Sequence, residues 1–247
     1  MHLYDKKVPQ CVFFILLEAE GYLECDTASE EEYESYCYTY THIYNNMITE
    51  GKAYYSGAEF LYGDHSLGRN TFENNVMFGC EKGCMALYLH CGKKNMGMNN
   101  IVHRNRKLAN MYGGCGQQTL DRPQEYENYH NIYLLDDMDD FTFGRSNDRY
   151  FDLPPNFHHN IYWSTIPDAK EKRKFPDNLN WYEWQASGND TGSLWENPLF
   201  EDADAHIYIL AEDSPAWELG IQQIDLDNIG IQDYGKYEKD KEHNLWP

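Results

Sequence analysis

Two consecutive asparagines followed by a short apolar run recur along this 247-residue chain at nearly constant spacing. The second asparagine of the first three copies is Asn46, Asn75 or Asn100, and two variant copies read His-Asn and end at Asn131 and Asn160. The intervals between these residues are 29, 25, 31 and 29. Self-similarity at such a period is the signature of stacked-repeat architectures. The repeat therefore constrains the fold before the propensity of any single residue is considered.

The apolar runs that follow the asparagines predict strands. Each run has three to five residues and is rich in Ile, Val, Met, Tyr and Phe, which is too short for a helix. Strands that recur at this interval stack most simply as coils of a parallel β-solenoid. Asparagine tolerates unusual turn geometry, and its amide can bond to its stacked neighbour. We therefore expect the asparagines to form a structural turn ladder and not a binding site.

The charge balance excludes several classes of partner. The net charge is −21, from 41 acidic and 20 basic residues. Binding to nucleic acid needs clustered Lys and Arg, and docking on anionic membranes needs the same, so neither partner is expected. Acidic runs such as residues 136–140 are expected to be solvated loops. Calcium binding by one of them stays an alternative, because Ca²⁺ takes carboxylate and carbonyl oxygens; no other cofactor or metal is expected.

The sequence contains no pattern that identifies a targeting signal, a membrane span, a disulfide framework or a zinc site. The sequence shows no secretory signal, and the apolar stretch at residues 11–17 is too short to span a bilayer. The seven cysteines are an odd number and lack zinc-site spacing, so we expect them to pack in the core. The 21 tyrosines either fill and cover the solenoid or line one face, where rings can stack on sugars.

The sequence divides into three parts. Residues 1–40 show no repeat and are interpreted as a cap or a disordered segment. Residues 41–233 carry the repeats and form the expected β-helix domain, with an irregular insert at 166–190. The charged residues 234–247 are expected to be a frayed tail.

Three segments near the C-terminal end carry a family resemblance. Residues 194–200 read LWENPLF, residues 213–220 read DSPAWELG, and residues 224–230 read IDLDNIG. These are similar to the "DPLF", "DSPALxLG" and "IDLSKIG" segments of right-handed parallel β-helix proteins of the glycoside-hydrolase and polysaccharide-lyase type. The resemblance covers residues 41–232, about three quarters of the chain.

The resemblance implies a fold and a function. The fold would be a single all-β, right-handed parallel β-helix of about five to seven coils, similar to the C-terminal part of a longer family member. The function would be carbohydrate-active and glycoside-hydrolase-like, with a polysaccharide or oligosaccharide bound along the solenoid face of a monomer. The family type favours an extracellular location. The alternative is a non-catalytic glycan-binding or structural solenoid that has lost its pair of catalytic acids.

Three segments resemble the family's site loops and supply candidate residues. Residues 62–66 read YGDHS, residues 89–92 read LHCG, and GQQ at 116–118 precedes an Asp-Arg pair. By this resemblance and the coil spacing, the catalytic candidates are Asp64 as nucleophile or base, His90 as its orienting partner and Arg122 as a group that holds an acidic sugar or lowers the pKa of the carboxyl. The candidates for substrate binding are His65, Gln117 and Gln118.

Each catalytic candidate also has a structural interpretation. Asp64 could cap a turn, His90 could be a core histidine, and Arg122 could pair with a neighbouring acid. Hydrolysis needs a second carboxyl group about 5–9.5 Å from the first, and Glu59 and the acidic run at 136–140 are the sources in the sequence. Lyase chemistry, with a basic residue such as Lys93 near the cleft, is a further alternative.

Overall fold

The protein is described here by a computed structural model. It describes residues 15–17, 40–49, 59–63, 69–78, 85–89, 95–103, 107–111, 126–135, 143–145, 156–175 and 178–226. Within these ranges most of the regular structure is β-strand, and the two helices, α3 (Ala169–Lys172) and α4 (Trp181–Ala186), are short. The prediction of a β-rich chain is confirmed.

Sixteen of the described strands form three parallel sheets. The first sheet contains β1 (Ile15–Leu17), β4 (Glu59–Gly63), β7 (Met85–Leu89), β10 (Lys107–Met111) and β13 (Phe143–Arg145). The second contains β2 (Tyr40–Tyr44), β5 (Arg69–Glu73), β8 (Asn95–Met98), β11 (Tyr126–Tyr129) and β14 (Asn156–His158). The third contains β3 (Met47–Thr49), β6 (Val76–Phe78), β9 (Ile101–His103), β12 (Ile132–Leu134), β15 (Ile161–Trp163) and β16 (Leu194–Trp195).

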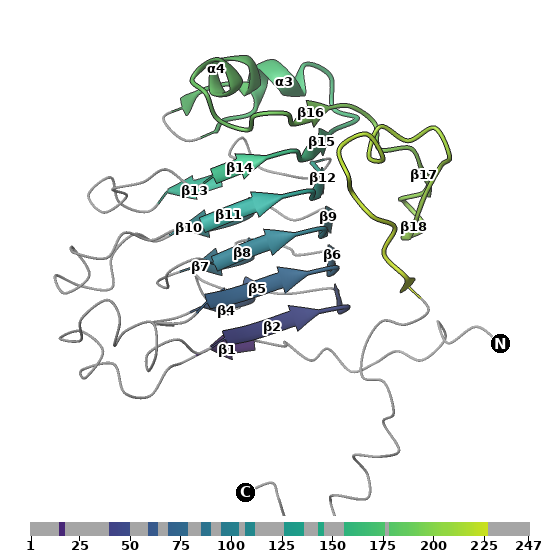
Figure 1. The fold of residues 1–247 in the computed structure, drawn as a ribbon. Helices are drawn as coiled ribbons and strands as arrows, with labels where there is room; N and C mark the ends of the chain where they lie inside the picture. Colours follow the sequence, from purple (N-terminus) through teal and green to yellow (C-terminus); the bar gives the residue numbers. More distant parts are fainter. Residues whose placement is uncertain are drawn as a thin grey trace, which may run out of the picture.

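Each run of three successive strands gives one strand to each sheet, and we call such a triplet a coil. The first coil is β1–β3, the fifth is β13–β15, and β16 continues the third sheet beyond it. Figure 1 shows the strands of each sheet lying one above the next along the molecule. This repeat of parallel strands is compatible with a solenoid. The first sheet begins with Ile15–Leu17, which pairs with Leu61–Gly63, so one strand of this sheet comes from the segment before residue 41.

The asparagine spacing corresponds to the offset between coils. In the third sheet Val76 pairs with Ile101, Ile101 with Ile132, and Ile132 with Ile161. Each of these residues directly follows the second asparagine of its copy. The residue before that asparagine has a left-handed backbone in all five copies, with φ between 52° and 56°. Asparagine, and less often histidine, tolerates this conformation, and it turns the chain from the second sheet into the third.

The second asparagines form a continuous amide ladder. The Nδ2 group of Asn46 donates to Oδ1 of Asn75 at 2.9 Å, and Asn75 donates to Asn100 at 3.0 Å. Asn100 donates to Asn131 at 2.9 Å, and Asn131 to Asn160 at 3.1 Å. Each accepting Oδ1 atom also receives a hydrogen bond from the backbone N–H group of the ladder asparagine in the preceding coil, at 2.8–3.1 Å. The predicted turn ladder is present.

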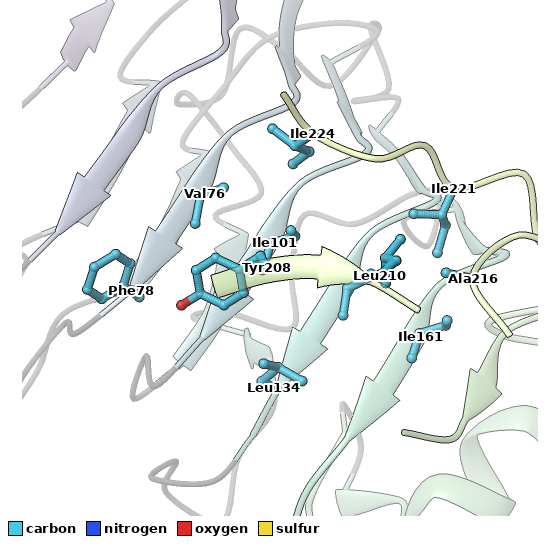
Figure 2. Packing of buried hydrophobic residues seen from close by; sticks show 11 residues of the cluster. Val76, Phe78, Ile101, Leu134, Ile161, Tyr208, Leu210, Ala216, Ile221 and Ile224 are labelled. Atoms are coloured by element: carbon cyan, nitrogen blue, oxygen red, sulfur yellow. The ribbon is translucent and has the colours of Figure 1, made fainter. Parts of the chain in front are cut away.

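The middle strands of the third sheet, β6, β9 and β12, are buried on both faces. The middle residues of these three-residue strands point into the stack of coils, where the Tyr133 hydroxyl group donates a hydrogen bond to Asn128 of the second sheet. The other face of the third sheet is covered by residues 200–224, including the antiparallel pair β17 (Phe200–Asp202) and β18 (Ile207–Leu210). Figure 2 shows Tyr208 and Leu210 lying over Ile101, Leu134 and their neighbours. We call residues 200–224 the covering segment.

The fifth coil is closed by the two helices and an aromatic cluster. Tyr162 contacts Phe175, Trp181 and Trp195, with ring centroids 5.0–6.3 Å apart. Asn180 is the N-cap of α4 and forms a capping box with Glu183. The Asn180 side chain accepts from the Glu183 backbone N–H group, and the Glu183 side chain accepts from the Asn180 backbone N–H group. Helices and aromatic rings therefore cover the end of the stack, where an open edge would recruit other chains.

Across the described residues, the structure contains no helix that is both long enough and apolar enough to span a membrane. The boundary expected at residue 233 and the expected tail at 234–247 lie outside the described ranges, as does most of the segment 1–40.

Candidate binding face on the second sheet

The six site residues predicted from the sequence lie outside the described residues: Asp64, His65, His90, Gln117, Gln118 and Arg122. The strands that precede two of them are described. β4 ends at Gly63 and β7 ends at Leu89, and these two residues are register partners. Asp64 and His90 each follow one of them directly in the chain. Their roles remain predictions.

The described residues hold a different polar face, on the outer side of the second sheet. Along each strand, side chains alternate between two sides. Ile43, Phe72, Asn128 and Phe157 are register partners on the inner side and are at most 8% exposed. Their neighbours in sequence point the other way. We call the following set the outer strip: His42, Tyr44, Glu73, Met98, Glu127, Tyr129 and His158.

Two imidazole–carboxylate pairs lie near the two ends of the outer strip. His42 Nε2 is 2.8 Å from Glu73 Oε2, and His158 Nε2 is 3.2 Å from Glu127 Oε1. Each pair joins neighbouring coils, because β2 pairs with β5 and β11 pairs with β14. All four side chains are partly exposed, so solvent screening keeps the contribution of each pair to stability small. Their polar atoms remain accessible to a ligand.

Aromatic rings accompany these pairs. Tyr44 is 54% exposed, and its ring centroid is 4.5 Å from that of His42. Tyr129 stacks on its register partner His158 with the ring planes 7° apart, and its hydroxyl group donates to the Met98 sulfur at 3.0 Å. Partial burial raises the pKa of Tyr129, and the carboxylates of Glu127 and Glu73 raise it further. The Tyr129 hydroxyl therefore stays protonated and able to donate.

A group of three histidines lies at the turn next to the outer strip. His158 Nδ1 is 3.0 Å from His159 Nδ1, and the ring of His130 is 6.0 Å from that of His159. Burial lowers the pKa of His130, and the neighbouring His159 and His158 lower it further. The His159 ring lies against Gly192, where an added Cβ would be 2.8 Å from His159 Nε2. Glycine at this position makes room for the ring.

The ranges that the structure describes contain no cluster of metal-ligating side chains with three or more members. No group of three or more His, Cys, Asp or Glu side chains there could hold a metal ion. The acidic run at residues 136–140, which was a candidate for Ca²⁺, lies outside these ranges.

The outer strip was missed by sequence reasoning for a clear reason. The strands that carry it precede the asparagine pairs, and segments such as RNTFE at 69–73 lack the apolar alternation that identifies a half-buried strand. The available signal was the repeat itself. Counting back from each Asn pair would have aligned Tyr44, Glu73, Met98, Tyr129 and His158 as one column.

Comparison with known proteins returns no relative: no family model, no curated protein and no solved structure matches the chain.

Proposed function

We propose that the chain is a right-handed parallel β-helix whose outer strip binds an extended, neutral saccharide. The hand of the coil and the type of ligand follow from the resemblance of residues 194–230 to β-helix proteins that act on carbohydrates. The observation that carries the binding face is the outer strip, in which partly exposed imidazole, carboxylate and tyrosine groups of the first, second, fourth and fifth coils lie on either side of Met98 from the third coil.

The chemistry of the strip suits sugar hydroxyl groups. Carboxylates accept hydrogen bonds, tyrosine hydroxyls donate them, and imidazoles do both. The exposed Tyr44 ring offers apolar surface beside these groups. Neighbouring strands of a sheet lie about 4.8 Å apart, so equivalent groups recur at a spacing similar to the length of one sugar unit. A linear saccharide that crosses the strands would meet hydrogen-bonding groups of the strip at the first, second, fourth and fifth coils and the Met98 side chain at the third.

The charge of the molecule favours a neutral saccharide over an acidic one. The net charge is −21, and the described carboxylates of the strip, Glu73 and Glu127, are each paired with one histidine. A polyuronate would approach against this field. Discrimination against acidic glycans is therefore part of the proposal.

A glycan array with matched variants tests this proposal. The wild-type protein should bind neutral linear oligosaccharides, and Tyr44→Ala combined with Glu73→Gln should abolish the signal, because both the ring and one hydrogen-bonding pair are lost. Tyr182→Ala is the control, since Tyr182 is 52% exposed on α4 and lies outside the strip. An array without any binding, or equal binding by all three proteins, would contradict the proposal.

Glycoside hydrolysis is the second candidate function. One observation favours it: Gly63 and Leu89 are register partners, so Asp64 and His90 follow strand ends on neighbouring coils. In this proposal Asp64 is the principal acid, and Glu59 or the acidic run at 136–140 supplies the second carboxyl group that hydrolysis needs. Release of reducing ends from the array's best ligand by the wild-type protein, and its loss in Asp64→Asn, is the expected result. Binding without turnover would leave the non-catalytic function.

A further inference from the structure

We propose that His158 and His159 together bind one divalent transition-metal ion of the Cu²⁺ or Ni²⁺ type at the edge of the outer strip. This site is independent of the saccharide proposal, because it depends only on two imidazoles and their neighbours.

The separation of the two imidazoles sets the geometry. His158 Nδ1 and His159 Nδ1 are 3.0 Å apart. An ion bonded to both nitrogens at about 2.0–2.1 Å would see them at an angle of about 95°. This is near the right angle of square-planar and tetragonal sites, which Cu²⁺ and Ni²⁺ prefer, and is narrower than a tetrahedral zinc site requires. The pair therefore favours copper or nickel.

Glu127 prepares His158 for ligation. The His158 Nε2–H group donates to Glu127 Oε1 at 3.2 Å, which places the proton of a neutral ring on Nε2. The lone pair is then on Nδ1, the atom that faces His159. A carboxylate that holds the far nitrogen of a ligating imidazole is the usual second partner in such sites, because it fixes the tautomer and makes the ligand more basic.

His159 is held in place by the backbone around it. Its own φ is 52°, and its ring lies against Gly192, whose φ is 75°. The residue is exposed, so an ion can arrive directly from solvent. In the metal-free protein, His159 Nδ1–H donates to His158 Nδ1. On binding, this proton moves to His159 Nε2, so each ring stays neutral, and the two rings turn so that their Nδ1 lone pairs converge on the ion instead of on each other.

The protein supplies two ligands, and water completes the coordination. Among the residues that the structure describes, no third His, Cys, Asp or Glu converges on the pair. The acidic molecule attracts cations, with a net charge of −21. An ion held by two imidazoles keeps open positions, where oxygen atoms of a ligand can replace water.

The test counts Cu²⁺ ions bound by the full untagged chain, with a chelating dye as competitor. His159→Asn should lose one bound ion, and its fold should be kept, because asparagine occupies the equivalent left-handed position in the first three coils. Glu127→Gln should keep the ion but bind it about 10–100-fold more weakly. His42→Gln is the matched control, since it removes the other imidazole–carboxylate histidine and should keep the ion.

Paramagnetic resonance of bound Cu²⁺ gives the second readout. The wild-type spectrum should show a tetragonal site with nitrogen splitting from two imidazoles, and His159→Asn should lose that splitting. An unchanged number of bound ions in His159→Asn would overturn the proposal, whatever the other variants do. The same conclusion would follow if the splitting were equal in the wild-type protein and His159→Asn, because the bound copper would then lie elsewhere.

Discussion

At the scale of single residues, the buried asparagines of the ladder use both the nitrogen and the oxygen of their side-chain amides in hydrogen bonds. Asn100 is typical: its Nδ2 group donates to Phe72 O at 2.9 Å and to Asn131 Oδ1 at 2.9 Å. Its Oδ1 atom accepts from the backbone N–H and the side chain of Asn75, both at 3.0 Å. All of these partners are buried, so the network strengthens the stack only while every member is present.

Replacing one middle member of the ladder should therefore be costly. Asn100→Ala removes the side-chain acceptor of the Asn75 backbone N–H and Nδ2 groups, and it removes the side-chain donor to the Phe72 carbonyl and Asn131 Oδ1. All of these groups are buried, and each one left unsatisfied costs about 1–3 kcal/mol. We expect a loss of about 3 kcal/mol or more in the free energy of unfolding, measured by urea titration. Asn46→Ala, at the part-buried first position, should cost clearly less. If both variants lost the same free energy of unfolding, the position of an asparagine in the ladder would not affect its contribution to stability.

The residue scale also shows what the sequence could predict. The recurrence of Asn-Asn was sufficient to predict the ladder, because one residue type with one conformational preference recurs at the coil interval. The hydrogen-bond partners of Asn160, the last asparagine of the ladder, could not be predicted in the same way. There the ladder ends on Ser193 and Asp190, and Asp190 is the last residue of the segment 166–190, which was expected to be an irregular insert.

At the scale of elements, Asp190 joins the ladder to the helical end. It is fully buried and accepts from Asn160 Nδ2, Tyr162, Ser193 and Trp184 Nε1. Burial raises the pKa of Asp190 above the ordinary value of 3.8, and the four hydrogen bonds act in the opposite direction. The folded protein therefore holds this proton more tightly than the unfolded chain does.

This raised pKa predicts a pH dependence with a definite sign. The contribution of Asp190 to stability is fully present below pH 3.8 and declines as the pH rises through the folded-state pKa. The free energy of unfolding of the wild-type protein minus that of Asp190→Asn should thus fall as the pH is raised from about 4, measured by urea titration at a series of pH values. The same subtraction with Asp213→Asn, an exposed position, corrects for removing one charge. A difference that is flat or grows with pH would refute this role.

The covering segment depends on Tyr208. This side chain is fully buried between Phe78, His103 and Phe200, and its hydroxyl group lies 2.9 Å from His103 Nδ1. Tyr208→Phe keeps the packing and loses the hydroxyl group, so we expect a cost of about 1 kcal/mol in unfolding free energy. Tyr208→Ala also removes the ring and should cost about 3–5 kcal/mol.

Limited proteolysis separates a local from a global effect of Tyr208. In Tyr208→Ala, cleavage should start within residues 200–224 while the five coils remain protected, because the ladder does not pass through this segment. Tyr182→Phe is the control, since Tyr182 is exposed and its hydroxyl group makes only a long hydrogen bond, of 3.4 Å, to Glu171 Oε1. If Tyr208→Ala were cleaved no faster than the control, the segment would not depend on this residue for its attachment.

At the scale of the whole molecule, repetition explains which parts of the fold could be predicted. The third-sheet strands were predictable because each copy is a short apolar run behind the same turn. The covering segment was not identified, although the runs VMF and IVH are apolar without alternation, which is typical of strands buried on both faces. The candidate site shows the same limit: counting back from each Asn pair aligns its positions, but the residue types at those positions differ between coils, so no repeated motif marks them as a site.

A crystal structure of the protein with the best neutral oligosaccharide from the array would show the coil and the ligand together and would therefore test both parts of the proposed function. We expect a right-handed coil with the three described sheets, and a saccharide that crosses the second sheet and contacts Tyr44, Glu73 and Glu127. A left-handed coil, or a saccharide bound away from the outer strip, would contradict the proposal.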